Sequence, residues 1–404
     1  TPRSTRLFIL MTAFLNLAGI GIIAPVLPFI VGRYTAPADA AFVGSLLFTS
    51  YSFFQFIASP TLGALSDRYG RRPILLISLL GSAVGYLIFG IGGALWVLFA
   101  GRIIDGITGG NLSTIFAYAA DITEPQERTR FFGLIGAFSG LGFVFGPAVG
   151  FLMYTLFQTP EAPLFAAAAL TLANTVWGYF AMPESLSAEK RAPSINLARL
   201  NPLTQLLNVF RIPGVRILLL ATFLWAMAFA SLQSNLSFLT EQQLGWDAAG
   251  TNVIFLVVGI VGIITQGVVV QRILPRFGEA RLATAGMMLM GVGFVLIALI
   301  PVTKSVALVF ISILFTAFGN GLILPTLRSL ISATVSPREQ GKIQGGNESI
   351  QALARVVGPL CPGYTYTVIS ASAPYWIGAG VLLLGAITVW SSTRAKLTPG
   401  KVSA

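Results

Sequence analysis

The sequence predicts an all-α integral membrane protein whose helices form two six-helix bundles. Of its 404 residues, 55% are hydrophobic and only 10% are charged, whereas soluble globular proteins have about 25% charged residues. Apolar stretches of about 20 residues, the length that a helix needs to cross a bilayer, recur along the whole chain. These stretches do not alternate between apolar and polar residues as strands of a β-barrel do. Because lipid offers no hydrogen bonds to backbone N–H and C=O groups, the stretches are expected to be helices.

The apolar stretches define twelve expected transmembrane helices. They lie at residues 7–30, 41–65, 73–93, 95–119, 131–155, 163–182, 215–238, 249–271, 282–301, 305–330, 343–368 and 372–393. The first stretch follows a basic start, as in a signal peptide. It is too long for one, however, lacks a convincing small-residue cleavage site and leads into further spans. We therefore expect it to be the first helix.

Basic residues predict how these helices are oriented. The formal net charge is +11, and Arg and Lys gather in alternate gaps, in stretches such as "DRYGRR" (67–72) and "QERTR" (126–130). The other gaps hold essentially Arg33 and Lys304. Because cytoplasmic loops carry an excess of Arg and Lys, the charge reports topology in a lipid bilayer rather than a nucleic-acid partner. With an even number of spans, both termini are expected in the cytoplasm, in a multi-pass protein of the cell inner membrane.

The stretch "GALSDRYGRRP" (63–73) joins the second and third spans. Its glycines allow a tight turn and close helix approach, while its acid can pair with arginines or cap the next helix. This spacing resembles the signature loop of the major facilitator superfamily. The resemblance implies the major facilitator fold and a latch at the cytoplasmic face in the outward-open state. Its expected members are Gly63, Asp67, Arg68, Gly70 and Arg71.

The stretch "GLIGAFSGLGFVFGPAVG" (133–150) resembles the fifth-helix antiporter motif of the same superfamily. A glycine-rich face lets two helices touch backbone to backbone, and proline bends the helix. The matching residues are Gly133, Gly142, Gly146, Pro147 and Gly150. Phe151 stands where the motif has a last glycine. The resemblance implies an antiporter.

The longest gap divides the chain into two halves. Residues 183–214 contain Pro, Ser and Asn and separate six spans from six, so we predict bundles at 1–182 and 215–404 joined by a cytoplasmic linker. The halves repeat: "DITEPQERTRFFG" (121–133) aligns with "ATVSPREQGKIQG" (333–345). Parallel repeats of six helices are typical of secondary transporters with a substrate site near the membrane midplane.

Several stretches together resemble the tetracycline-efflux branch of the twelve-helix drug/proton antiporters. They are "NLAGIGIIAPVLP" (16–28), "GRIIDGITGG" (101–110), "AYAADITEPQERTR" (117–130) and "PREQGKIQG" (337–345). The resemblance implies proton-driven export of amphiphilic drugs. Where that branch has membrane acids in the first, third and ninth helices, this chain has Asn16, Gly85 and Met290.

Four charged residues lie well inside predicted spans, namely Arg102, Asp105, Glu348 and Arg355. Each costs about 2.5–3.5 kcal/mol at the middle of a membrane, so such groups persist when they are paired and useful. Arg102 and Asp105, at i and i+3, share a helix face, and Glu348 and Arg355, two turns apart, share another. Each predicted pair combines a titratable acid with a permanent cation.

Such pairs predict proton coupling. A carboxylate beside Arg stays ionised, and it takes a proton when helix movement or substrate removes the Arg, because burial favours the neutral form. We expect the proton gradient to be the energy source, without a cofactor. The alternatives are a static ion pair for Asp105, a structural Arg102 that bonds backbone carbonyls of the first helix, and a static or snorkelling Glu348.

By the superfamily pattern, the first and fourth helices of each half line the substrate cavity. That nominates Asn16, Asn111, Trp225, Gln233, Asn235 and Asn320 as substrate contacts in an apolar surround. Such a pocket suits amphiphilic or aromatic substrates.

Cysteine and histidine usage excludes other classes of protein. Cys361 is the single cysteine and histidine is absent, so an intrachain disulfide and a His-based triad are impossible. We expect no metal and no enzymatic activity. The predicted function is a monomeric, proton-coupled exporter of small amphiphilic compounds, of tetracycline type or multidrug type, that works by alternating access. The alternatives are a proton-coupled uptake symporter for a small organic solute and a non-transporting membrane sensor or scaffold.

Overall fold

The computed structural model describes residues 3–193, 200–203, 207, 210, 214–334 and 340–397. Parts of the predicted linker (183–214) and of the repeated stretch 333–345 lie outside these ranges. Within the described ranges the regular structure is helical and no strand is present. Helices occupy all twelve ranges at which the sequence predicts transmembrane helices.

Helix contacts divide the chain into two compact units. The first comprises Thr1–Thr204 and Leu236–Leu256, and the second comprises Gln205–Asn235 and Val257–Ala404. The segment Leu236–Leu256, which the sequence places in the second half, packs with the first unit. There the Ser237 hydroxyl donates to the Ala24 carbonyl oxygen at 2.8 Å. The division therefore passes through α9 (Arg216–Leu244) and α10 (Ala248–Ile264) rather than through the linker alone.

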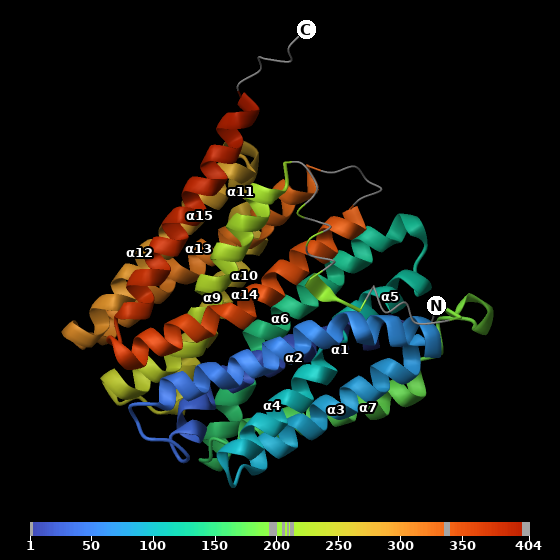
Figure 1. Ribbon diagram of the computed structural model, residues 1–404, viewed down its shortest axis with the longest axis horizontal. Coiled ribbons are helices and arrows are strands. Elements are labelled where there is room, and N and C mark those ends of the chain that lie inside the picture. The colour runs from blue at the N-terminus through green and yellow to red at the C-terminus, as the bar shows by residue number, and fades with distance from the viewer. Residues whose placement is uncertain are drawn as a thin grey trace. The chain divides into compact units, whose positions relative to one another are not determined.

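The first unit is built from long helices that share extensive contacts. They are α1 (Arg3–Val31), α2 (Ala40–Tyr69), α3 (Arg71–Ile91), α4 (Leu95–Gly109), α5 (Leu112–Ile122), α6 (Pro125–Phe157) and α7 (Ala162–Ala181), followed by the short 3-10 helix η1 (Ala188–Lys190). Within this unit α3 packs against both α4 and α7, and α1 packs along α6 (Figure 1).

The second unit has the same kind of packing. Besides its share of α9 and α10, it holds the π-helical turn η3 (Thr265–Val269), α11 (Val270–Phe277), α12 (Glu279–Thr303), α13 (Val306–Ser332), α14 (Gln340–Val368) and α15 (Ala373–Leu397). Here α12 packs against α13 and α15 (Figure 1).

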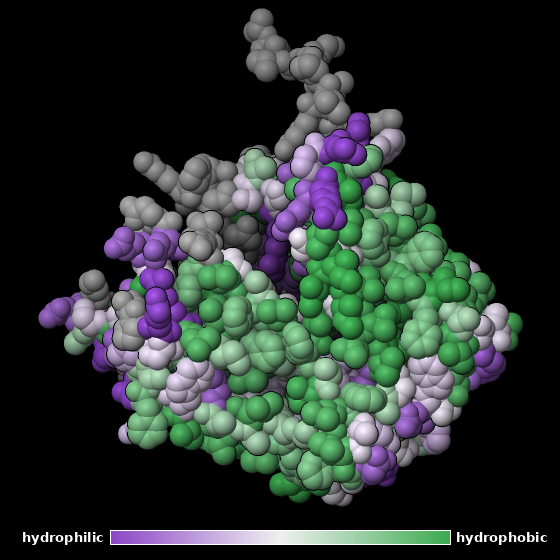
Figure 2. Space-filling model, turned by 180° about the vertical axis from the view of Figure 1, so that it is seen from behind, coloured by the Kyte–Doolittle hydropathy of each residue, from purple (hydrophilic) through white to green (hydrophobic). Residues whose placement is uncertain are grey.

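The surface of the helices is apolar. Ile77, Trp96 and Phe180 are 63%, 73% and 81% exposed, and hydrophobic residues cover most of the face shown in Figure 2. A soluble monomer rarely exposes so large an apolar area. In the described ranges, ten helical stretches are long and apolar enough to cross a membrane. The two predicted spans outside these ten are the fourth, which is interrupted, and α14, whose first half is rich in polar residues.

The fourth predicted span is interrupted between α4 and α5 for a packing reason. A Cβ atom on Gly110 would lie 2.9 Å from the backbone nitrogen of Ser59, so glycine lets the chain approach α2 closely there. The interruption frees the carbonyl of Gly109, which accepts a hydrogen bond from the Gln55 amide at 3.0 Å. A backbone group freed within a membrane span is thus satisfied by a neighbouring helix.

Both units contain the same close contact between two helices. In the first unit, a Cβ on Gly101 of α4 would lie 2.8 Å from the carbonyl oxygen of Gly85 on α3. In the second unit, a Cβ on Gly319 of α13 would lie 2.5 Å from the carbonyl oxygen of Gly286 on α12. In membrane proteins, small residues let two helices approach closely enough for such backbone contacts. Parallel repeats predict that a contact of this kind occurs in both units.

Candidate functional site

The first unit buries an ion pair on α4. The Arg102 guanidinium donates through Nη1 to Asp105 Oδ2 at 3.1 Å, and the two residues are only 3% and 2% exposed. Beside the pair, the hydroxyl oxygens of Ser82 on α3 and Thr108 on α4 lie 3.1 Å apart, within hydrogen-bond distance. The pair predicted from the i, i+3 spacing is therefore present and is shielded from solvent.

Aromatic rings complete the surroundings of the arginine. The guanidinium carbon of Arg102 lies 4.2 Å from the ring centroid of Tyr51 on α2 and 5.9 Å from that of Phe89 on α3. Desolvated cation–π contacts of this kind stabilise a buried cation. The predicted bonds from Arg102 to backbone carbonyls of α1 are not among its contacts within the described residues. The arginine is held from α2, α3 and its own helix.

Gly85 lies directly against the buried acid. A Cβ atom at this position would lie 2.8 Å from the Cβ of Asp105 and 2.9 Å from the carbonyl oxygen of Gly101. Gly85, where the resemblance described above implies an acid, therefore adjoins Asp105, the acid that this chain carries on α4. In the second unit, Met290, which stands where the resemblance implies an acid on the ninth helix, is fully buried and packs against Gly319.

Two of the predicted substrate contacts meet in the first unit. The Asn16 amide on α1 donates to Asn111 Oδ1 at 2.8 Å, and Asn111 lies in the interruption between α4 and α5. Asn111 is fully buried, and its amide nitrogen has no hydrogen-bond partner within the described part of the chain. A buried, unsatisfied donor costs about 1–3 kcal/mol, which a bound water or ligand would offset.

Two more of them meet in the second unit. The Trp225 indole on α9 donates to Asn320 Oδ1 on α13 at 3.0 Å, and its ring stacks on Phe229 with centroids 6.2 Å apart. Gln233 is half-buried on the same helix. Asn235 is fully buried and donates within its own helix, so the structure does not place it beside Trp225.

Glu348 has a different partner from the one that the sequence predicts. It accepts a hydrogen bond from Arg328 Nη2 of α13 at 2.7 Å, and both side chains are half-buried. The predicted pairing with Arg355 was wrong because seven residues along a helix span about 10 Å, too far for direct contact. A neighbouring helix supplies the cation instead.

The antiporter-like stretch forms the contact between α6 and α1. A Cβ on Gly142 would collide with the Phe14 carbonyl oxygen, and one on Gly146 would collide with that of Ala18. Pro147 lies against Gly21 of α1, and a Cβ on Gly150 would lie 2.9 Å from Asn252 Oδ1. No atom of a described residue lies within 4 Å of the corresponding Cβ position of Gly133. Most of the motif therefore forms a backbone-to-backbone seam, and Gly133 stands outside it.

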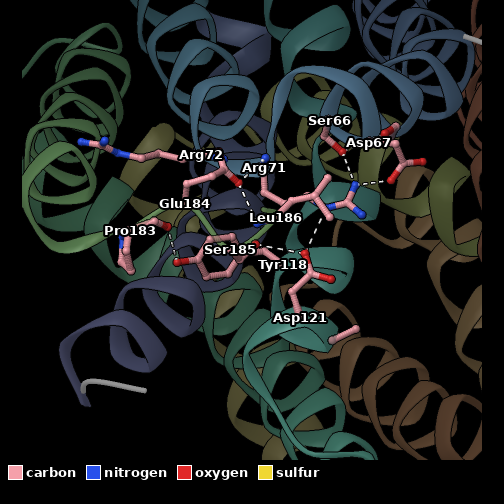
Figure 3. Close-up of polar contacts among 12 residues, drawn as sticks. Ser66, Asp67, Arg71, Arg72, Tyr118, Asp121, Pro183, Glu184, Ser185 and Leu186 are labelled. Carbon is pink, nitrogen blue, oxygen red and sulfur yellow. Dashed lines mark hydrogen bonds and ion pairs between the residues drawn. The ribbon is translucent and has the colours of Figure 1, made fainter. Parts of the chain in front are cut away.

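The turn between α2 and α3 is held by a cluster of polar side chains, which we call the loop cluster (Figure 3). Its members are Ser66, Asp67, Arg71, Arg72, Asp121 and Glu184. The Arg71 guanidinium pairs with Asp67 and, through Nε at 3.2 Å, with Asp121. It also donates to the Ser66 hydroxyl at 2.7 Å. The predicted latch arginine thus ties α2, α3 and the end of α5 together.

The other predicted latch residues have separate places. Gly70 makes the turn with φ of 108°, a conformation that favours glycine. A Cβ atom on Gly63 would lie 3.4 Å from the Ser113 hydroxyl oxygen. Arg68 is exposed and lies over the Tyr69 ring, 5.4 Å from its centroid, outside the loop cluster.

Glu184 acts as a cap for α3 from a distant part of the chain. Its carboxylate accepts from the backbone N–H of Arg71 at 2.9 Å and of Arg72 at 3.2 Å, the first two residues of α3. It also accepts from the N–H of Leu186 at 3.0 Å. A carboxylate at a helix N-terminus satisfies unpaired donors and interacts favourably with the helix dipole.

We expect Glu184→Ala to destabilise the protein by about 1–2 kcal/mol, because two helix donors and one loop donor lose their acceptor. Thermal unfolding of the purified protein in detergent measures this effect. Glu189→Ala is the matched control, since Glu189 is exposed in the same segment. An equal loss in both variants would show that Glu184 contributes only its charge.

Sequence reasoning missed Ser66, Asp121, Glu184 and Arg328. A signal was available for Asp121 and Glu184: a loop with three arginines needs acceptors, and the acids that follow the fourth and sixth spans are the nearest candidates. No such signal was available for Arg328. It lies near the end of a predicted span, where a basic residue is expected simply because cytoplasmic ends of spans are rich in Arg and Lys.

Comparisons with known proteins agree with this architecture. The sequence profile of the Major Facilitator Superfamily matches residues 9–345 and 272–403. The chain is 35% identical to a class C tetracycline resistance protein of Escherichia coli over 92% of its length and 91% of that protein. It is 32% identical to the class E protein of Escherichia coli, with 95% and 94% covered.

A solved structure extends this similarity to three dimensions. The chain resembles the human organic anion transporter MFSD10 (TETRAN) with a TM-score of 0.73 and 28% identity, over 96% of this chain and 100% of that one. These comparisons confirm the predicted all-α membrane fold, and proteins of this kind are transporters rather than enzymes. The chain is a multi-pass membrane transporter that belongs to the major facilitator superfamily and lies near its tetracycline-efflux branch.

Proposed function

We propose that this protein is a proton-coupled exporter of small amphiphilic organic compounds, with Asp105 as the proton carrier. The observation that carries the proposal is the buried ion pair on α4. Asp105 is a titratable group in a dry surround, and Arg102 stabilises its ionised form at 3.1 Å. A shift of α4 that lengthens this contact favours the protonated acid, because burial then penalises the charge. Proton binding is thereby linked to conformation.

The polar contacts in the two units support small organic substrates. Each unit joins a residue on its first helix to one at the fourth span, Asn16 to Asn111 and Trp225 to Asn320. Few polar groups among aromatic and aliphatic side chains suit amphiphilic compounds better than sugars. The relatives' names, tetracycline resistance protein and organic anion transporter, agree with substrates of this size and character.

The remaining features of the proposal follow from the sequence. The proton gradient drives export by alternating access, and no cofactor takes part. The protein acts as a monomer in the cell inner membrane with both termini in the cytoplasm, as the distribution of Arg and Lys favours. The α1–α6 glycine seam supports exchange of proton for substrate rather than symport, through the resemblance of this stretch to the antiporter motif.

Proteoliposomes with an acidic lumen test the proposal. Pyranine inside the vesicles reports lumenal pH while tetracycline is added outside. We expect the lumenal pH to rise on addition, because entry of the compound exchanges for protons that leave. Protein-free vesicles are the control. Entry that requires acid outside instead supports the alternative of proton-coupled uptake, and transport with no proton movement in either arrangement refutes proton coupling.

A further inference from the structure

One face of α14 carries three polar side chains with unsatisfied groups. Asn347, Gln351 and Arg355 are spaced i, i+4 and i+8, so they lie one above another, and we call them the α14 polar row. Asn347 Oδ1, Gln351 Nε2 and Arg355 Nε are each buried without a hydrogen-bond partner among the residues that the structure describes. Asn347 is 1% exposed and Gln351 is 7% exposed. Buried polar groups are nearly always paired, so three orphans in one row need an explanation.

Arg355 is the charged member of this row and lacks an acidic partner within the described residues. It lies about 22 Å along α14 from Gln340, at 1.5 Å per residue, and thus near the middle of the helix. The acid on the same helix, Glu348, is engaged by Arg328 at 2.7 Å. An unpaired cation at this depth is costly, and such residues mark substrate or ion pathways.

Helix α14, which carries the row, touches α9, which carries the aromatic pair of the second unit. Gly358, one turn beyond Arg355, is where α14 touches α9: a Cβ there would lie 2.8 Å from the Met227 carbonyl oxygen. Trp225 and Phe229, stacked on each other, lie on α9 two residues before and two residues after Met227. An apolar ring surface and an unpaired cation therefore occupy adjoining helices at similar depth.

We propose that the α14 polar row binds an acidic group of the transported compound, so that the substrates are amphiphilic anions or zwitterions. The Arg355 guanidinium pairs with a carboxylate or similar anion, and the Gln351 amide donates a second hydrogen bond. Guanidinium–carboxylate bonds are among the strongest polar contacts in a dry site, and one carboxylate can accept from both Arg355 Nε and Gln351 Nε2. This substrate class rests on the proposed transport function and narrows it.

Binding of a matched pair of probes tests the substrate class. Naphthalene-2-carboxylate and naphthalene-2-carboxamide share shape and aromatic surface, and only the first carries a charge. Titration of each into purified protein, followed by thermal stabilisation, gives the two affinities. We expect the carboxylate to bind the wild type about tenfold or more tightly than the amide, and Arg355→Gln to remove this preference. Arg355→Lys, which keeps the charge, is expected to retain part of it.

Arg328→Gln is the control variant, because Arg328 is an arginine of the same unit that already has an acidic partner. It is expected to leave the preference for the carboxylate unchanged. Equal binding of the two probes to wild type, binding of neither, or a preference that survives in Arg355→Gln overturns the proposal. The wild-type comparison decides the matter even where a variant does not fold.

The two proposals fail in different experiments. Probe binding is measured without a pH gradient, so it does not depend on proton coupling. Loss of the pyranine response with an intact carboxylate preference refutes the proton-coupled mechanism and leaves the anion site standing. A normal pyranine response with equal probe affinities refutes the anion site and leaves the proton-coupled mechanism standing.

Discussion

Asp105→Asn is expected to abolish transport driven by a pH gradient while leaving substrate exchange intact. Asparagine keeps the size of the side chain but cannot gain or lose a proton. Asp105 is 2% exposed and bonds Arg102 at 3.1 Å, so the substitution removes the titratable group of a buried ion pair. The rate of gradient-driven uptake into proteoliposomes should fall at least about tenfold, which corresponds to a free-energy difference of about 1.4 kcal/mol or more. Exchange of labelled for unlabelled substrate, with no gradient, should persist.

The control for this variant is Asp39→Asn, which makes the same chemical change at an exposed position without a side-chain capping bond. Removing one partner of a buried ion pair leaves the other charge uncompensated, at a cost of about 3–5 kcal/mol. A double variant, Arg102→Gln with Asp105→Asn, separates this loss of stability from loss of coupling. Undiminished gradient-driven transport in well-folded Asp105→Asn would exclude Asp105 as the proton carrier.

Gly142→Ala is expected to have the second largest effect, through the α1–α6 seam. The added methyl group would occupy the position of the Phe14 carbonyl oxygen, so the two helices have to separate. Backbone cannot rotate away as a side chain can, and we expect a destabilisation at or above the upper end of about 1–3 kcal/mol for overpacking. The yield of monodisperse protein and its thermal unfolding in detergent measure this effect.

Gly140→Ala is the matched control for the seam. It makes the same substitution two residues away on α6, where no described residue lies within 4 Å of the added atom. It is expected to leave stability unchanged or slightly raised, since alanine favours helix more than glycine does. Equal losses in both variants would show that glycine at these positions matters for helix flexibility rather than for contact with α1.

Most of the fold could be predicted from the sequence because lipid imposes a simple rule. Each apolar stretch of about 20 residues has to be a helix, and helices occupy all twelve expected ranges. The rule says nothing about where a helix is interrupted. The break at Asn111 depends on close approach of Gly110 to α2, a tertiary contact that the local sequence does not contain. The packing of Leu236–Leu256 with the first unit was missed for the same reason.

The candidate site could be predicted where its contacts are local. Arg102 and Asp105 lie one turn apart, so helix geometry alone brings them together. Glu348 was assigned the wrong partner because its ion pair crosses from α14 to α13, and spacing within one helix cannot reveal a contact between two. Glu184 illustrates the same limit, since it caps a helix more than 100 residues earlier in the chain.

The repeated glycine contacts also show how the two units have diverged. Arg102 follows Gly101 on α4, and Asn320 follows Gly319 on α13, so the two residues hold equivalent positions. The first is charged and pairs with an acid, whereas the second is neutral and accepts from Trp225. Equivalent backbone positions thus carry an ionic contact in one unit and a neutral one in the other.

The interruption at Asn111 divides the fourth span into two helical segments joined by a hinge. Asp105 lies on one arm, α4, and Asp121 of the loop cluster lies on the other, α5. No continuous ladder of helical hydrogen bonds crosses the joint, so the arms can pivot without breaking one. Any coupling between the two ends is reciprocal. If the contact between Arg71 and Asp121 changes the proton affinity of Asp105 by some factor, protonation of Asp105 changes the equilibrium constant of that contact by the same factor.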